Sequence, residues 1–170
     1  MTLALLLRHA VSIAILPFTV AVAIPVWLAR RNGTTLTVAT GALGVISQIA
    51  GILLLAIGLV LFVASLSRFA SEGKGTLAPW DPPRQLVLRG PYRYVRNPMI
   101  SGVIFVLFGE ALLLQSRPHF DWALTFLVIN LIYIPLLEEP GLKRRFGEAY
   151  VEYCRHVRRF IPRLKPWNPG

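Results

Sequence analysis

Two segments of this sequence combine residue types that could bind a charged ligand and position it for chemistry. The first, Trp80 to Pro98, is rich in Pro, Arg and aromatic residues and poor in helix formers. Such a loop is costly to order unless it binds something or packs on the rest of the protein. Asn97 and Pro98 suit the start of a helix, with Asn as N-cap and Pro as the first helical residue. We therefore expect a helix N-terminus that stabilises an anionic group such as a carboxylate.

The second segment begins with two adjacent acids, Glu138 and Glu139, at the end of an apolar run in an otherwise basic region. Carboxylates placed there need cationic or hydrogen-bonding partners, and Arg93, Arg96 or a ligand hydroxyl or amine would serve. A purely structural interpretation stays open for both segments. The first could be a solvated loop that touches lipid phosphates, and the second an amphipathic helix that lies on anionic lipid. The apolar face of that single helix would consist of Leu142, Phe146, Ala149, Tyr150, Tyr153 and Val157.

Four apolar runs must position these segments, and they predict an all-α fold, a multi-pass transmembrane helical bundle in one domain over residues 1–170. A helix needs about 20 residues to span the ~30 Å hydrocarbon core. The fourth run is shorter than this, so it must thin the bilayer, tilt little or continue as helix beyond its apolar part. The predicted transmembrane helices cover approximately residues 10–29, 41–67, 98–116 and 122–138, followed by a C-terminal amphipathic helix.

Composition favours a membrane protein over a nucleic-acid-binding one. The 170 residues are 55% hydrophobic and 15% charged, with a net charge of +10. Of the 18 Lys and Arg residues, only Arg30, Arg31 and Arg117 fall on the opposite side of the four-helix topology from the rest. The positive-inside rule then places both termini and the long loop in the cytoplasm. This asymmetry accounts for the charge without nucleic acid, for which no base-reading motif is present.

Metal binding, a catalytic triad and disulfide chemistry have less support in the sequence. The three histidines are scattered and form no metal-binding spacing or catalytic triad. The single cysteine, Cys154, cannot form an internal disulfide or a cysteine metal site alone. Glu110 lies within the third apolar run, where a carboxylate is costly, so it is a functional candidate. A structural hydrogen bond between helices would explain Glu110 equally well.

Several ordered motifs resemble one family of membrane enzymes. They are Arg89-Gly90-Pro91-Tyr92-Arg93-Tyr94-Val95-Arg96-Asn97-Pro98-Met99, Gly102, Glu138-Glu139, Phe146-Gly147 with Tyr150 and Tyr153, and Ile161-Pro162. Together these motifs, over about residues 85–162, resemble the isoprenylcysteine carboxyl methyltransferase and phospholipid methyltransferase family. Its members are small integral membrane enzymes that use S-adenosylmethionine. The first two predicted helices match the family only in being hydrophobic.

The resemblance implies a cofactor site at the cytoplasmic face, built from segments at about 84–102 and 138–162 and covered by the folded C-terminal segment. It implies that Arg96, Asn97 and Glu138 are catalytic, that Glu138 is the acid contacting the cofactor, and that no metal is used. The cofactor-binding residues would be Arg84, Gln85, Leu86, Val87, Gly90, Tyr92, Asn97, Pro98, Met99, Ile100, Glu138 and Glu139.

The chain departs from the family pattern at four places. Asn97 stands where the family usually has histidine, and Ile100 where tyrosine is common. Ile134 lies close to the position at which eukaryotic carboxyl methyltransferases have an arginine suited to a substrate carboxylate. Val157-Arg158-Arg159 replaces a common Val-Pro-Arg.

The function implied by the resemblance is S-adenosylmethionine-dependent methylation of a hydrophobic, membrane-resident acceptor, as in carboxyl O-methylation of the isoprenylcysteine type. Phospholipid N-methylation is the alternative within enzymes. A non-catalytic scaffold or a transport subunit is the alternative outside them, and Glu110 facing a water-filled path would favour transport. The expected partners are membrane lipids and a lipophilic methyl acceptor, without nucleic acid. The expected location is the cytoplasmic membrane of a bacterium, with the active site on the cytoplasmic side.

Overall fold

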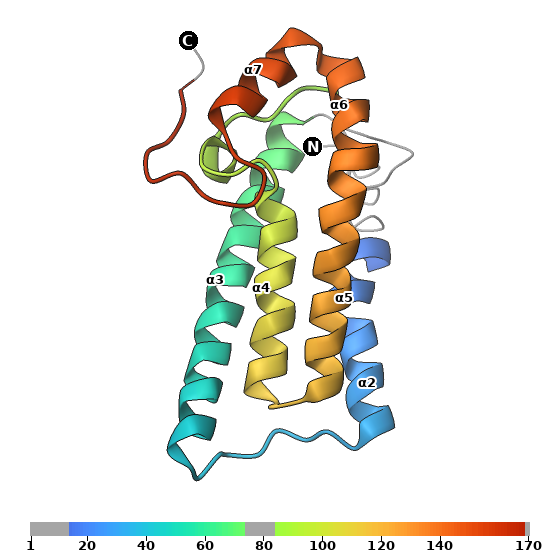
Figure 1. The fold of residues 1–170 in the computed structure, drawn as a ribbon, viewed down its shortest axis with the longest axis vertical. Coiled ribbons are helices and arrows are strands. Elements are labelled where there is room, and N and C mark those ends of the chain that lie inside the picture. The colour runs from blue at the N-terminus through green and yellow to red at the C-terminus, as the bar shows by residue number, and fades with distance from the viewer. Residues whose placement is uncertain (1–13, 74–83, 169–170) are drawn as a thin grey trace.

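The computed structural model describes residues 14–73 and 84–168. These residues form helices and no strand, which confirms the all-α prediction (Figure 1). Along the chain the elements are the π-helical η1 (Ala14–Ala23), α2 (Ile24–Asn32), α3 (Ala42–Glu72), the 3-10 helix η2 (Gly90–Arg93), α4 (Pro98–Leu113), α5 (Arg117–Tyr133), the π-helical η3 (Ile134–Glu138), α6 (Glu139–Phe146) and α7 (Glu148–His156).

Two of the described helices are long and apolar enough to cross a membrane. They are α3, with 31 residues, and the continuous helix Arg117–Phe146 that α5, η3 and α6 form together. The apolar helix α4 has 16 residues and is about 24 Å long. The predicted count of four spans therefore stays a prediction.

The short fourth apolar run is extended by helix on both sides. The helix begins at Arg117 and continues past the apolar residues to Phe146, over 30 residues or about 45 Å. Glu138 and Glu139 therefore lie two turns before the end of a helix. Of the options left open for the short run, the structure shows helix that continues beyond its apolar part, while the end of the transmembrane segment near the acids stays a prediction.

The first predicted helix is described from residue 14 onward; its residues 10–13, and Arg8, lie outside the described residues. Its two prolines coincide with a change of helical pitch. Pro17 lies inside η1, and Pro25 lies in the first turn of α2. A proline removes a backbone donor and crowds the preceding turn, so a regular α-helix cannot pass through it undisturbed. The chain accommodates both prolines by wider π-helical turns before Ile24.

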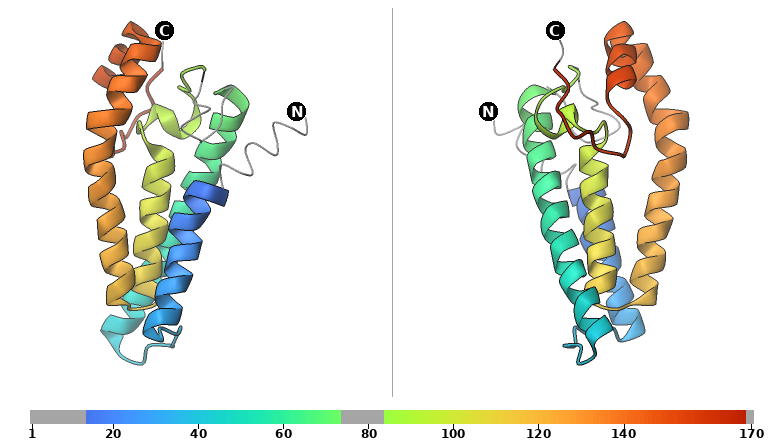
Figure 2. Two further views of the ribbon diagram at one scale, coloured as in Figure 1. Left: turned by 90° about the vertical axis from the view of Figure 1, so that its right-hand side faces the viewer. Right: turned by 60° about the vertical axis from the view of Figure 1, so that its left-hand side comes forward.

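Helices α3 and α4 are packed closely along their length, through glycines on both sides (Figure 2). A Cβ built on Gly51 would lie 2.6 Å from the backbone nitrogen of Leu113, and one built on Gly109 would lie 2.9 Å from the Gly51 carbonyl oxygen. Gly58 and Gly102 approach each other's backbones in the same way. Because nothing larger than a hydrogen fits between the backbones, this glycine seam fixes where α4 begins relative to the end of α3.

The basic residues separate to the two ends of the bundle. Arg30 and Arg31 end α2 and Arg117 begins α5, and these helix ends lie at the same end of the molecule (Figure 1). The loop before α4, α6, α7 and the C-terminal segment lie at the other end. This agrees with the charge separation expected from the sequence, while the assignment of that end to the cytoplasm stays a prediction.

The predicted single amphipathic helix is two helices. Gly147 separates α6 from α7 with φ +57° and ψ −135°, a conformation that strongly favours glycine. The apolar residues still meet, since Tyr150, Tyr153 and Val157 are buried together and Leu142 and Phe146 pack against them. The hydropathy pattern therefore identified the residues of one cluster but not the turn that brings them together.

The glycine seam gives a stability test far from the loop before α4. Gly51→Val should lower the free energy of unfolding by about 1–3 kcal/mol, because its methyl groups would clash with backbone atoms of α4. Gly141→Ala is the matched control, since a Cβ there meets nothing within 4 Å and alanine stabilises helices. Thermal unfolding in detergent, followed by circular dichroism, compares them. Equal melting temperatures for Gly51→Val and the unaltered protein would show that the helices do not pack as described.

Candidate functional site

The C-terminal segment after α7 runs back along the loop that precedes α4 and is bound to it through the backbone. Both segments supply donors and acceptors, so the connection resembles a short stretch of strand pairing. The hydrogen bonds run from Arg96 N to Arg158 O (2.9 Å), Asn97 N to Arg159 O (3.3 Å), Arg163 N to Tyr94 O (2.9 Å) and Trp167 N to Arg93 O (3.0 Å). The C-terminal segment is thus folded back onto the loop, while its predicted role of covering a cofactor stays a prediction.

Aromatic side chains reinforce the same contact. The hydroxyl of Tyr153 donates a 2.6 Å hydrogen bond to the carbonyl oxygen of Tyr92, which fixes η2 against α7. Trp167 packs against Tyr153 and stacks on the ring of His156 at a centroid distance of 5.4 Å. Leu86 and Leu88 pack against the same cluster. The described part of the loop, from Arg84 onward, is thus held in place by packing on α7 and the C-terminal segment.

Glu139 lies between two arginines from different segments. Its Oε1 and Oε2 accept hydrogen bonds from Arg159 Nε and Nη2, each at 2.7 Å. Arg96 forms an ion pair with the same carboxylate, with its Nη2 3.2 Å from Oε1. The Glu139 side chain is 17% exposed and that of Arg96 is 10% exposed. The hydrogen bonds to Glu139 raise the pKa of the Arg159 guanidinium. Arg96 is thus confirmed as a partner of the acidic pair, whereas Arg93 donates instead to the Trp167 carbonyl oxygen at 2.9 Å.

Glu138 lies beside Tyr92 and has a different environment from its neighbour. No described residue makes a hydrogen bond or an ion pair with its carboxylate. Burial raises the pKa of the Tyr92 phenol well above its usual value, and the charge on Glu138 raises it further. The partly buried Glu138 therefore has free acceptor capacity next to the η2 turn, which is what a ligand hydroxyl or amine would need.

The start of α4 is where the sequence predicts it, but the cap differs. Asn97 is the residue before the helix and Pro98 its first residue, yet the Asn97 side chain does not cap it. Its Nδ2 instead donates to the Arg159 carbonyl oxygen at 3.4 Å. No described residue accepts a hydrogen bond from the backbone N–H of Met99 or Ile100. Two donors at this helix N-terminus are therefore available to an anionic group.

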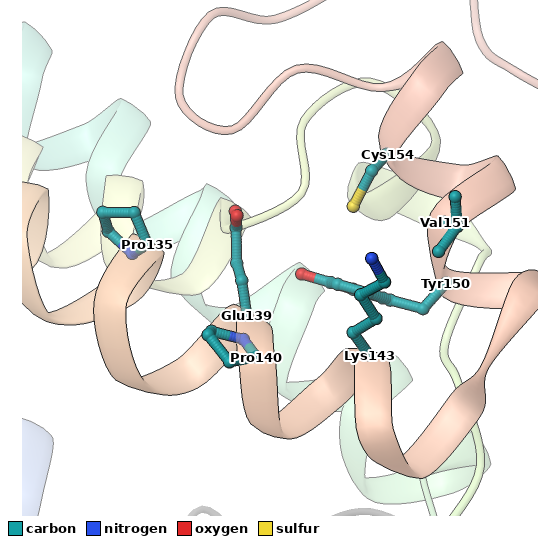
Figure 3. Close-up of a pocket in the computed structure, with 7 residues that line it drawn as sticks. All are labelled: Pro135, Glu139, Pro140, Lys143, Tyr150, Val151 and Cys154. Carbon is teal, nitrogen blue, oxygen red and sulfur yellow. The ribbon is translucent and has the colours of Figure 1, made fainter.

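An open pocket of about 330 Å³ lies between α6 and α7, on the side of Glu139 (Figure 3). Arg96 Nη1 donates to the sulfur of Cys154. Burial raises the pKa of the Tyr150 phenol, and the neighbouring Cys154 sulfur raises it further. The pocket therefore combines a few polar side chains with a mainly apolar lining. The pocket is lined by Pro135, Glu139, Pro140, Lys143, Tyr150, Val151 and Cys154.

The predicted site residues divide into two groups. Tyr92 lies beside Glu138, Arg96 pairs with Glu139, and Asn97 bonds to Arg159, which in turn binds Glu139. Gly90 begins η2, and Pro98, Met99 and Ile100 form the first turn of α4. Arg84 and Gln85 lie beside the end of α3, where their backbone N–H groups donate to Gly73 O at 2.8 and 3.2 Å. Val87 is 6% exposed and contributes to the core. The cofactor-binding role predicted for all these residues remains a prediction.

Glu110 lies apart from this site. It is twelve residues from Pro98 along α4, or about 18 Å by helical rise, toward the opposite end of the bundle. Its Oε2 is buried without a hydrogen bond from any described residue. The hydrogen bond between helices that would explain Glu110 structurally is thus not formed at that oxygen.

Sequence reasoning missed the residue that binds Glu139 most closely. Arg159 is 20 residues away from its partner and follows a turn and a helix, so no helical periodicity connects them. The one available signal was the family's Val-Pro-Arg, whose final arginine Arg159 matches. Lys143, Tyr150, Val151 and Cys154 were not predicted to line a pocket either, because the break at Gly147 that forms it leaves no trace in hydropathy.

Comparison with known proteins agrees with this description. The family model for phospholipid methyltransferases matches residues 46–149, more than half of the chain. The chain therefore belongs to the phospholipid methyltransferase family, which confirms the resemblance and implies a methyltransferase. The match begins within α3, earlier than the motifs that first pointed to the family. No curated protein and no solved structure matches the chain significantly. The family and the two membrane-capable helices together indicate a membrane protein.

The contact between Tyr153 and Tyr92 can be tested with a single-atom change. Tyr153→Phe removes the donor and leaves the Tyr92 carbonyl oxygen without its partner, which should cost about 1–3 kcal/mol of unfolding free energy. Tyr94→Phe is the control, because Tyr94 is 38% exposed and its hydroxyl bonds to no described residue. Denaturant unfolding in detergent measures both variants. If both lose the same amount, the hydrogen bond does not hold η2 on α7.

Proposed function

We propose that this protein is an S-adenosylmethionine-dependent methyltransferase that acts on a hydrophobic, membrane-resident acceptor. The observation that carries the proposal is the contrast between the two adjacent acids. Glu139 is bound by two arginines, while Glu138 keeps its acceptor capacity beside Tyr92 and the start of α4. Membership of a methyltransferase family supports the same function.

The residues at this end of the bundle fit the chemical groups of the cofactor. A carboxylate with unused acceptor sites suits a ribose hydroxyl or an amino group, and Glu138 offers one. The free N–H groups at the start of α4 suit the carboxylate of a methionine moiety. An aromatic ring such as that of Tyr92 attracts a sulfonium through its π face. Glu138, Tyr92, Met99 and Ile100 would hold the cofactor.

Methyl transfer from a sulfonium places modest demands on the protein. The bound cofactor supplies an electrophilic methyl group for in-line displacement. The chain's own residues need to align the acceptor and exclude water rather than provide a strong acid or base. The buried cluster of Tyr150, Tyr153 and Val157 would shield one side of the site from solvent. Asn97, which has replaced the family's histidine, cannot act as a base and instead binds Arg159 through its side-chain amide.

We infer that the acceptor is a carboxylate, as in the isoprenylcysteine type of reaction. A carboxylate nucleophile needs no base, whereas an amine must lose a proton. Neither described histidine is available as that base: His119 is bonded to Ser116 and to the Pro25 carbonyl oxygen, and His156 is bonded to Glu152 on the surface. Phospholipid N-methylation is the second candidate, because the matching family model is named for phospholipid methyltransferases. The site would face the cytoplasm.

Cofactor binding is tested with S-adenosylhomocysteine by calorimetric titration in detergent. The unaltered protein should bind, and Glu138→Ala and Tyr92→Ala should each abolish binding while expression stays near normal. Both changes remove groups that would contact the cofactor directly. Glu148→Ala is the control, because Glu148 is an exposed acid at the start of α7. Failure of a folded sample to bind would count against an enzyme and favour a scaffold or transport role. Wild-type affinity in both site variants would refute the site.

The acceptor chemistry is tested with a radiolabelled methyl donor and total membrane lipid. A methyl ester is hydrolysed by mild base and releases its label as methanol, whereas an N-methyl group resists the same treatment. We expect the label to be released. Label that stays with the lipid after base treatment would assign N-methylation of a phospholipid instead.

A further inference from the structure

We propose that Arg159 is a positioning residue that, together with Arg96, holds Glu139 and so leaves Glu138 as the acid that contacts the cofactor. This inference rests on the proposed function and assigns different roles to two residues of the same type. Glu139 would then support the site without touching the cofactor.

The acceptor capacity of the two carboxylates carries the inference. An ionised carboxylate has about four lone-pair sites for hydrogen bonds. On Glu139, two of them accept hydrogen bonds from the fork of Arg159 at 2.7 Å each, and Arg96 adds an ion pair at 3.2 Å. A bidentate contact between an arginine and a carboxylate is among the strongest hydrogen-bonded contacts in proteins. Glu139 therefore has little left to offer a ligand, whereas no described residue occupies Glu138.

Helix geometry transmits the restraint from one acid to the other. Adjacent residues of a helix point in different directions, about 100° apart where 3.6 residues make an α-helical turn. Glu139 begins α6 directly after Glu138 ends η3, within one continuous helix. A fixed direction for the Glu139 side chain consequently fixes the rotation of the helix and the direction of Glu138 toward Tyr92.

Arg159 is itself held where it can exert this restraint. Its carbonyl oxygen accepts hydrogen bonds from the backbone N–H of Asn97 at 3.3 Å and from the Asn97 side chain at 3.4 Å. Arg159 thus joins the residue before α4 to the first residue of α6. These are the two places from which the cofactor-binding groups would come, so Arg159 sets the distance between them.

A surface ion pair nearby provides the contrast. Arg155 pairs with Glu152 on α7, but their side chains are 67% and 49% exposed. Pairs as exposed as this contribute little, because water screens them and the side chains lose entropy. The pair of Arg159 and Glu139 is less exposed, at 33% and 17%, and connects segments rather than neighbouring turns of one helix.

The test is a double-mutant cycle on the dissociation constant for S-adenosylhomocysteine. Arg159→Gln and Glu139→Gln should each weaken binding by about tenfold. The double variant should be no weaker than either single one, because both changes break the same contact. Arg159→Lys should recover part of the affinity, since lysine keeps the charge but makes one bond in place of two. Arg155→Gln is the matched control and should bind like the unaltered protein.

The outcomes separate the role inferred for Arg159 from the proposed function. If the unaltered protein binds and Arg159→Gln binds equally well, the inference is wrong and the proposed function stands. Losses that multiply in the double variant would also overturn it, because they would show that the two residues act independently. If Arg159→Gln does not fold, Arg159→Lys and Glu139→Gln decide, and wild-type affinity in both refutes the inference. An unaltered protein that does not bind overturns the proposed function, and the inference with it.

Discussion

The ion-pair cluster around Glu139 is the contact on which the arrangement of the site depends. A carboxylate that is largely removed from water is stable only with well-placed charged partners, and Arg96 and Arg159 supply them from two other segments. Because the partners are far apart in the sequence, satisfying one charge draws three segments together: the residues before α4, the start of α6 and the chain after α7. The backbone hydrogen bonds and the aromatic cluster then close around this point.

The membrane part of the fold serves this cluster by fixing where its segments start. The glycine seam between α3 and α4 determines how far α4 is displaced along α3, and hence where Asn97 and η2 lie. The helix from Arg117 to Phe146 carries the acids past the apolar region without a break, so they remain rigidly connected to the bundle. Sites on continuous helices are held more closely than sites on loops, which suits a reaction that depends on alignment.

Much of the fold followed from hydropathy and a few punctuating residues. The long apolar runs predicted α3 and the core of α5, and Asn97-Pro98 predicted the start of α4. Apolar periodicity after Leu142 identified the cluster around Tyr153 but gave one helix in place of two, because the turn at Gly147 depends on a backbone conformation and not on polarity. The acids were located at the end of an apolar run, but hydropathy does not mark where helical hydrogen bonding stops, so the helix could not be bounded at Phe146.

The sequence by itself determined the helical class, the separation of basic residues to two ends, and the residue types from which the site is built. The motifs it carries determined the family as well. Only the tertiary structure showed which of two adjacent, chemically identical acids is bound by arginine and which has no hydrogen bond or ion pair from a described residue. Glu138 and Glu139 are the same type of residue and are adjacent in the chain. They differ only in the direction of their side chains, and that direction matters because Arg159, 20 residues away, lies on one side of the helix.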